Sequence, residues 1–175
     1  MKRFLLLGMV LVAGCSTVER GRYRPRSGNE KKAHGRADRS VSPADVKADF
    51  AAFANTEVAW AGIISDVQFK ETERTIQVAF QVEHRDFDWK DHGGGKPYRL
   101  SSTGEGLFLA GWTVNKPARI DYLRSRAKSG YMIVVHGKPY QTRAGVVQLS
   151  ATAVRPVKTG DFELLNEAAA AEETD

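Results

Sequence analysis

The strongest constraint on the fold of this chain is an alternation of apolar and polar side chains along residues 75–83. Every second residue from Ile76 to Val82 is apolar, whereas the residues between them are mostly polar. Successive side chains of a β-strand point to opposite faces, so this period of two predicts a strand with one buried and one solvated face. We predict this strand over Thr75–Trp89. Because such a strand must pair with others, the first expectation is a mainly β fold.

Four other segments have the composition of strands. Glu57–Phe69 is rich in β-branched and aromatic residues, and a polar turn at residues 70–74 would join it to the alternating strand as a hairpin. Gly62 within it predicts a bulge or a sharp bend. A polar loop is expected over residues 90–105 and a turn over Pro139–Ala144. The remaining strands are predicted at Gly106–Val114, Tyr131–Val135 and Gly145–Val154, the last ended by Pro156.

Two helices are expected among these strands. Ser42 can cap a helix that has Pro43 in its first turn and Asp45 at the third position of a capping box. The second helix is expected to begin at Pro117 and to stop at Gly130. The apolar faces consist of Val46, Phe50 and Phe53 in the first helix and of Ile120, Leu123 and Ala127 in the second.

The order of these elements is strand, strand, strand, helix, strand, strand. A helix between the third and fourth of five strands is the order of the OB-fold, a small Greek-key barrel. A different small barrel, or a sandwich with a helical insertion, remains the alternative. We therefore predict that residues 42–160 form a five-stranded OB-like barrel preceded by a short N-terminal helix.

Composition limits what surrounds this barrel. The chain has 175 residues, a net charge of +5 and one cysteine, which excludes a large multidomain enzyme, a disulfide framework and a cysteine-based zinc cluster. Residues 16–41 contain eight basic and three acidic residues and few apolar ones, so residues 15–41 are expected to be a flexible basic tether. Residues 161–175 contain six acidic and no basic residues. They are expected to be an acidic tail that includes a short terminal helix.

The N-terminus has the pattern of an export signal. Two basic residues precede Phe4–Gly14, an uncharged and mostly apolar run of 11 residues. A membrane-spanning helix needs about 20 apolar residues, so this run indicates a secretory signal over residues 1–14. The motif Val12-Ala13-Gly14-Cys15 follows and resembles the bacterial lipobox, in which the cysteine is lipidated and the signal is cut just before it.

The lipobox resemblance implies an anchored protein. Cys15 would carry a covalent lipid, and several acyl chains on one residue would make the anchoring stable. Ser16 resembles the residue at this position in lipoproteins that are sent to the outer membrane. The expected location is therefore the outer membrane, with the barrel on its periplasmic face. A free or buried thiol at Cys15 is the alternative.

Between residues 57 and 157 the chain contains the short motifs Trp60-Ala61-Gly62-Ile63, Gly106-Leu107-Phe108-Leu109-Ala110, Tyr122-Leu123-Arg124, Val134-Val135-His136-Gly137 and Arg155-Pro156-Val157. Together these motifs resemble the Slp-like outer-membrane lipoproteins. The resemblance implies an envelope lipoprotein with a stress-related or unknown role and assigns no catalytic residue. The loop at residues 88–105 is longer and more charged than the family pattern, and the acidic tail differs from it.

The densest group of chemically active side chains is a candidate metal site. His84, Asp86 and Asp88 would share one face of an extended strand, and His92 could fold back toward them. Imidazole and carboxylate groups together can bind a divalent metal. The alternative is a solvated strand end with Phe87 and Trp89 buried behind it, which the sequence favours. We expect no resident metal or other cofactor apart from the lipid on Cys15.

Aromatic and basic residues form a second set of candidates. Tyr98 and Tyr140 each follow a proline in a Gly-Lys-Pro-Tyr sequence, and they would form a binding rim if both loops lay at one barrel mouth. OB-folds often bind single strands in basic, aromatic grooves, but an exported lipoprotein rarely meets nucleic acid. The basic candidates are Arg99 in the loop and Arg119, Arg124 and Arg126 on the second helix.

These observations predict a non-enzymatic binding or adaptor module of the bacterial cell envelope. Its expected partners are the membrane, through the lipid, and an envelope protein, peptidoglycan or a lipid. Two alternatives remain open. One is a metal-dependent hydrolase that uses the cluster from His84 to His92, and the other is a purely structural role in envelope integrity.

Overall fold

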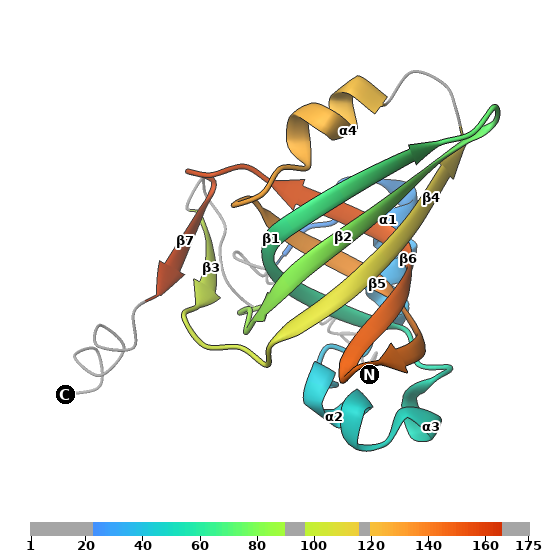
Figure 1. The fold of residues 1–175 in the computed structure, drawn as a ribbon. Coiled ribbons are helices and arrows are strands. Elements are labelled where there is room, and N and C mark those ends of the chain that lie inside the picture. Colours follow the sequence, from blue (N-terminus) through green and yellow to red (C-terminus); the bar gives the residue numbers. More distant parts are fainter. Residues whose placement is uncertain (1–22, 90–96, 116–119, 166–175) are drawn as a thin grey trace, which may run out of the picture.

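Five strands of this protein close into a barrel in a computed structural model that describes residues 23–89, 97–115 and 120–165 (Figure 1). Strands β1, β2 and β4 follow one another around it, and β6 and β5 complete it. The closure satisfies the backbone groups that an open sheet would expose at its edges. The barrel strands are β1 (Val58–Glu71), β2 (Thr75–Arg85), β4 (Leu107–Asn115), β5 (Met132–Arg143) and β6 (Val146–Val157).

The connectivity is that of an OB-fold. The strand order is β1-β2-β4-β6-β5, in which β4 and β6 run parallel and every other neighbouring pair, including β1 with β5, runs antiparallel. Helix α4 (Ile120–Arg126) connects β4 to β5, the third and fourth strands of the barrel. The predicted mainly β, five-stranded OB-like barrel with a helix at this position is confirmed.

The barrel interior is filled by the residues that the alternation predicted. The even-numbered residues of β2 from Ile76 to Val82 are all buried, and those between them face outward. Trp60 of β1 is also buried, and its indole Nε1 donates to the backbone oxygen of Val41 at 2.7 Å. That bond satisfies the single polar atom of the largest side chain in the core and ties the chain before α2 to the barrel.

The bulge of β1 does not lie at Gly62, where a bulge or a sharp bend was predicted. The register of β1 against β2 shifts between Ile64 and Asp66, so the extra residue is Ser65. A Cβ at Gly62 would lie 2.1 Å from the backbone oxygen of Glu83. Glycine is therefore required here because the two strands approach closely.

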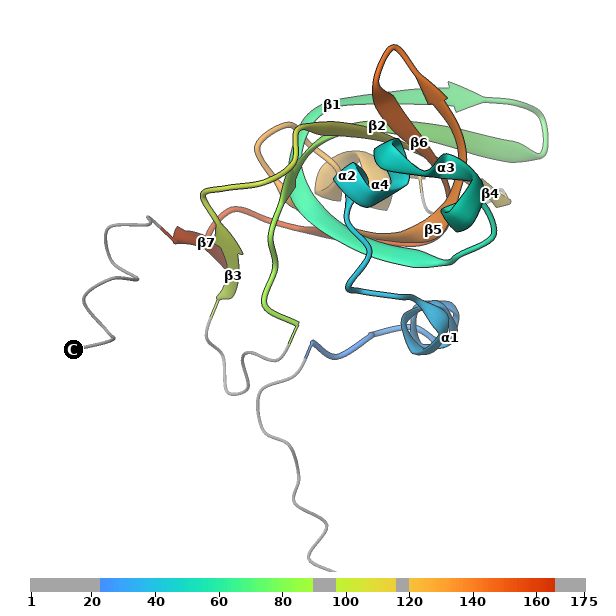
Figure 2. The same ribbon diagram turned by 90° about the horizontal axis from the view of Figure 1, so that it is seen from below.

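The predicted N-terminal helix is split into α2 (Pro43–Ala48) and α3 (Phe50–Phe53), which cross one end of the barrel, whereas α4 covers the other (Figures 1 and 2). The capping box is present: Ser42 accepts from the backbone of Asp45, whose carboxylate accepts from the backbone of Ser42. Asp49 interrupts the helix with φ −143° and caps α3. No helix in the described ranges is long and apolar enough to cross a membrane.

Strands β5 and β6 are longer than predicted. Pro139 lies inside β5 rather than in a turn, and Pro156 lies inside β6. β5 pairs with β1 only as far as Gly137. Beyond Gly137 the edge of β5 that faces β1 makes no hydrogen bonds to it, so a proline at position 139 interrupts none there. The turn between the two strands is Ala144-Gly145, both with positive φ.

The segments around the barrel also differ from prediction. Part of the expected polar loop is strand β3 (Tyr98–Ser101). Part of the expected acidic tail is strand β7 (Phe162–Leu165), so the terminal helix is wrong for these four residues. The two pair in parallel outside the barrel, and Leu100 of β3 is fully buried. Burial of this apolar side chain stabilises an ordered strand within an otherwise polar segment. Residues 166–175 lie outside the described residues.

The expected flexible tether is wrong for residues 23–41. This segment contains helix α1 (Gly28–Arg36), capped by Ser27, and Tyr23, Glu30 and Ala33 are buried against the barrel. The prediction from composition failed because contacts such as Glu30 with Arg155 and His34 with His136 join residues more than 100 positions apart. The composition of a short segment does not contain such contacts. Residues 23–41 therefore belong to the folded part of the protein, which was predicted to begin at residue 42. The signal and Cys15 lie outside the described residues.

Candidate functional site

A hollow lies on the outer face of the barrel, over the central strands β2 and β4. Ala79 and Gly111 are directly paired there. Of these two adjacent positions on the outer face, the first has only a methyl group and the second has no side chain. Gln68 of β1 pairs with Ala79 on the other side. The hollow has a volume of about 580 Å³. Its lining residues are Gln68, Phe69, Lys70, Gln77, Val78, Ala79, Gly111, Trp112, Thr113, Tyr140, Leu149 and Ser150.

Tyr140 is held beside this hollow by a bulge in β5. The register of β5 against β6 shifts between Pro139 and Gln141, so Tyr140 is the extra residue, and it is 52% exposed. Its hydroxyl donates to Oε1 of Gln148 at 2.7 Å, and Gln141 Nε2 donates to the same oxygen at 2.7 Å. Bulges commonly redirect a side chain, and here the bulge and two hydrogen bonds orient an exposed aromatic ring.

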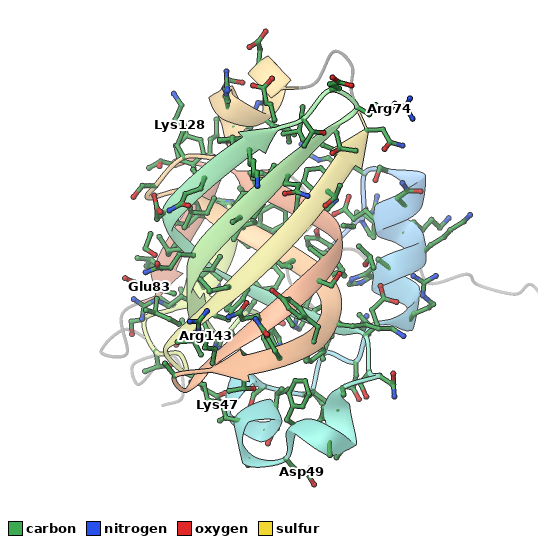
Figure 3. The ribbon with its side chains drawn as sticks, turned by 45° about the vertical axis from the view of Figure 1, so that its right-hand side comes forward. Lys47, Asp49, Arg74, Glu83, Lys128 and Arg143 are labelled. Carbon is green, nitrogen blue, oxygen red and sulfur yellow. The ribbon has the colours of Figure 1, made fainter. Side chains whose placement is uncertain are left out.

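The chemistry of the hollow is mostly neutral. Amide and hydroxyl groups from residues such as Gln77, Thr113 and Ser150 provide donors and acceptors. Of the described residues that line the hollow, Lys70 alone is charged. Figure 3 shows other charged side chains at the barrel ends, with Arg74 near one end and Lys47 near the other. A neutral surface with amide groups and an exposed ring suits a ligand that hydrogen-bonds through hydroxyl or amide groups and presents an apolar face.

A second pocket is basic and lies outside the barrel. It has a volume of about 320 Å³. It brings together two of the predicted candidates, Tyr98 of β3 and Arg126 of α4. Three basic residues that the sequence analysis did not single out also line it, namely Arg26, Arg155 and Lys158. Within the described ranges, Asp161 is the single lining residue with a carboxylate.

Arg155 joins this pocket to a buried ion pair. Its Nε lies 2.8 Å from Oε1 of Glu30, its Nη1 donates to the Tyr98 hydroxyl at 3.0 Å, and its guanidinium lies 4.6 Å from the centre of the Tyr23 ring. Burial by itself would raise the pKa of Glu30. Hydrogen bonds from Tyr23 and from the backbone of Arg26, together with the charge of Arg155, instead lower that pKa below its usual value.

Tyr23 completes this cluster. Its hydroxyl donates to the Glu30 carboxylate at 2.5 Å. Burial is the main cause that raises the pKa of Tyr23, although the charge of Arg155 acts in the opposite direction. The phenol is therefore neutral at physiological pH and serves as a hydrogen-bond donor.

The remaining basic candidates lie in other surroundings. Arg99 pairs with Glu163 across the β3–β7 sheet, and Arg124 pairs with Glu71 near the end of β1. Arg119 lies outside the described residues. Tyr98 and Tyr140 line different pockets, so they do not form the predicted common rim. The reason is that residue 98 belongs to a strand outside the barrel, whereas residue 140 belongs to β5.

The structure places His84 among packed aromatic rings. It is buried beside Trp60 and Phe108, and its Nδ1 accepts from the backbone of Glu105 at 3.2 Å. Burial is the main cause that lowers the pKa of His84. Among the described residues, no three histidine, cysteine or acidic side chains are arranged to hold a metal ion, so Asp86 and Asp88 do not complete a group with His84. His92 lies outside the described ranges.

A pair of histidines between α1 and β5 was missed by the sequence analysis. His34 Nδ1 lies 3.2 Å from His136 Nε2, and the Arg39 guanidinium, which can only donate, lies 3.3 Å from His34 Nε2. Neutral His34 therefore carries its proton on Nδ1 and donates it to His136. This leaves the His136 proton on Nδ1, which is buried without a hydrogen-bond partner among the described residues.

This arrangement disfavours protonation of both rings. Each imidazole nitrogen that could accept a further proton already faces a donor. Burial, followed by the neighbouring His34, lowers the pKa of His136 to about 4. Burial, followed by the charge of Arg39, lowers the pKa of His34. The pair is therefore neutral at pH 7, and the hydrogen bond between its rings joins α1 to the barrel.

No protein-family model matches the chain. No curated protein matches it either. A small single-stranded DNA-binding protein from Streptomyces coelicolor is similar in structure, with a TM-score of 0.37 and 14% sequence identity over 57% of this chain and 89% of that one.

Proposed function

We propose that this protein is a non-enzymatic binding module of the bacterial cell envelope, anchored by lipid on Cys15, whose barrel face binds a neutral glycan. The anchor rests on the lipobox-like sequence. In OB-folds the face of the second and third strands can bind oligosaccharides as well as oligonucleotides. The hollow lies on this face, since β2 and β4 are the second and third barrel strands. Its nearly uncharged lining favours a sugar over a nucleic acid.

The observation that carries this proposal is the position of Tyr140. An exposed ring held by a bulge and by Gln148 lies beside a hollow with neutral donors and acceptors. A sugar ring can pack its apolar face on a tyrosine while its hydroxyl and amide groups bond to glutamine, serine and threonine. Because the ring is already oriented, binding would cost little side-chain entropy.

Binding of an N-acetylglucosamine tetramer, measured by calorimetry on the full chain in neutral detergent, tests the proposal. Gly111→Val adds bulk to the floor, and the nearest atom to a new Cβ is 3.9 Å away, so the strand can accept it. We expect Gly111→Val and Tyr140→Ala to weaken binding at least about tenfold, and Tyr140→Phe to weaken it less, because the ring is kept.

Gln81→Val is the matched control, since it adds a branched side chain on the same face of β2 but does not line the hollow. It should leave affinity unchanged. The glycan proposal fails if the wild type does not bind the tetramer, or if Gln81→Val weakens binding as much as Gly111→Val does. The anchor is tested separately: Cys15→Ser should release the protein from the membrane fraction of intact cells.

A further inference from the structure

We propose that the basic pocket formed by Arg26, Tyr98, Arg126 and Lys158 binds a phosphate group. In the part of the chain that the structure describes, it shares no lining residue with the hollow on the barrel face. The inference goes beyond the glycan proposal and does not depend on it, because a different surface and a different chemistry are involved.

The charge of this pocket favours an anionic ligand. Among the residues that the structure describes, four basic side chains and one carboxylate line this pocket. The carboxylate of Glu30 pairs with one of them, Arg155. With Arg155 neutralised by Glu30, the side chains of Arg26 and Lys158 provide positive charge in the pocket against the carboxylate of Asp161. This excess of positive charge in a concave site attracts an anion, and partial enclosure screens the attraction less than an open surface would.

The hydroxyl of Tyr98 is the second argument. It accepts a hydrogen bond from Arg155 Nη1 at 3.0 Å, which polarises the O–H bond and leaves its proton to be donated. Among the described residues, that proton has no acceptor. A donor in contact with a guanidinium and set among basic side chains suits the oxygen atoms of a phosphate.

The fold holds these groups in place. Arg155 Nη2 donates to the backbone oxygen of Arg24 at 2.6 Å and to the Glu30 carboxylate at 3.1 Å. The chain before α1 runs outside the barrel between α1 and the β3–β7 pair (Figure 2). The buried ion pair thus fixes the segment that carries Arg26 next to the strand that carries Tyr98, so the pocket exists before a ligand arrives.

The same chemistry could meet a phosphate from two sources. A soluble phosphate would enter from the solvent. A phospholipid headgroup would be close by if Cys15 is lipidated, because the eight residue steps from Cys15 to Tyr23 span at most about 28 Å. The geometry allows both, and the experiment distinguishes them.

The test measures binding of three probes to the full chain in neutral detergent, by calorimetry and tryptophan fluorescence. The probes are inorganic phosphate, dihexanoylphosphatidylglycerol below its micelle concentration, and dihexanoylphosphatidylcholine as the zwitterionic control. We expect Arg26→Gln with Lys158→Gln to weaken phosphate-group binding at least about tenfold, and Tyr98→Phe to weaken it a few-fold, because one charge-assisted bond is lost.

Lys47→Gln with Arg143→Gln is the matched control, since it removes two exposed positive charges that do not line the pocket. Binding of phosphatidylglycerol without inorganic phosphate supports a headgroup as the source, and binding of inorganic phosphate alone supports a soluble ligand. Binding of neither anion overturns the proposal, as does an equal loss in the control variant. Failure of the glycan tetramer to bind would leave this result unaffected.

Discussion

The described residues that line the hollow all come from the five barrel strands. The basic pocket is instead lined by residues from four places: the segment before α1, β3, α4 and the chain around the end of β6. The hollow follows from strand register, because Ala79 and Gly111 are small residues paired with each other. The basic pocket instead depends on Glu30 and Arg155, which are 125 positions apart. The hollow is therefore as stable as the barrel. The basic pocket is only as stable as the attachment of the segments outside the barrel that line it, which are called the outer segments below.

Breaking the buried ion pair between Arg155 and Glu30 should cause the largest difference in stability between the basic pocket and the hollow. Arg155→Ala leaves the Glu30 carboxylate buried without its partner, which we expect to cost about 3–5 kcal/mol of unfolding free energy. Arg124→Ala is the control, because its ion pair with Glu71 is exposed and is worth less than about 1 kcal/mol. Urea unfolding measures the total loss in stability.

Hydrogen exchange of the same Arg155→Ala variant locates that loss. It should show faster exchange in α1 and β3 with little change in β2 and β4. Equal exposure of all four elements would mean that the outer segments and the barrel unfold as one unit, and the contrast between the two surfaces would disappear.

Acid should act on the same attachment through His136. Its folded-state pKa of about 4 lies below the ordinary value of 6.5, so the unfolded chain binds the proton more readily. The stability due to neutral His136 is fully present above pH 6.5 and is lost as the pH falls toward 4, by about 3 kcal/mol in total. Unfolding free energies measured between pH 7 and 5 should fall, and His136→Asn should flatten that slope. An unchanged slope in the variant would assign the acid sensitivity to other groups.

Removing helix caps gives the smallest and most local contrast. Ser27→Ala removes the acceptor for the Glu30 backbone in α1, and Ser42→Ala removes the capping box of α2, at a cost of about 1 kcal/mol each. The first change should weaken phosphate binding slightly and leave glycan binding unaltered. Ser42→Ala should affect neither ligand, because α2 lines neither pocket. A similar loss of both ligands in Ser27→Ala would show that the two surfaces are coupled.

Several parts of the fold could be read from local patterns. The alternation in β2 predicted which residues are buried, and the capping box at Ser42 predicted where α2 begins. Helix α1 was missed, although Ser27 and Glu30 have the spacing of a capping box and were a usable signal. Composition outweighed that signal, because the segment is basic and poor in apolar residues.

The candidate sites were less accessible. Tyr98, Arg126 and Tyr140 were selected from their residue types, but their division between two pockets depends on β3 pairing with β7 outside the barrel. No pattern in either short strand indicates this parallel pair, whose members are separated by about 60 positions. The position of Tyr140 depends on a bulge, which occupies a single residue and has no signature in the sequence.

The sequence by itself determined the order of the barrel elements, the buried face of β2 and the start of α2, because strand alternation and helix capping join residues a few positions apart. Only the tertiary structure decided that residues 23–41 fold onto the barrel, that Arg155 meets Glu30 and that His34 meets His136. Those contacts form when barrel closure brings distant segments together, and their energies come from burial and charge pairing that no local window of the sequence contains.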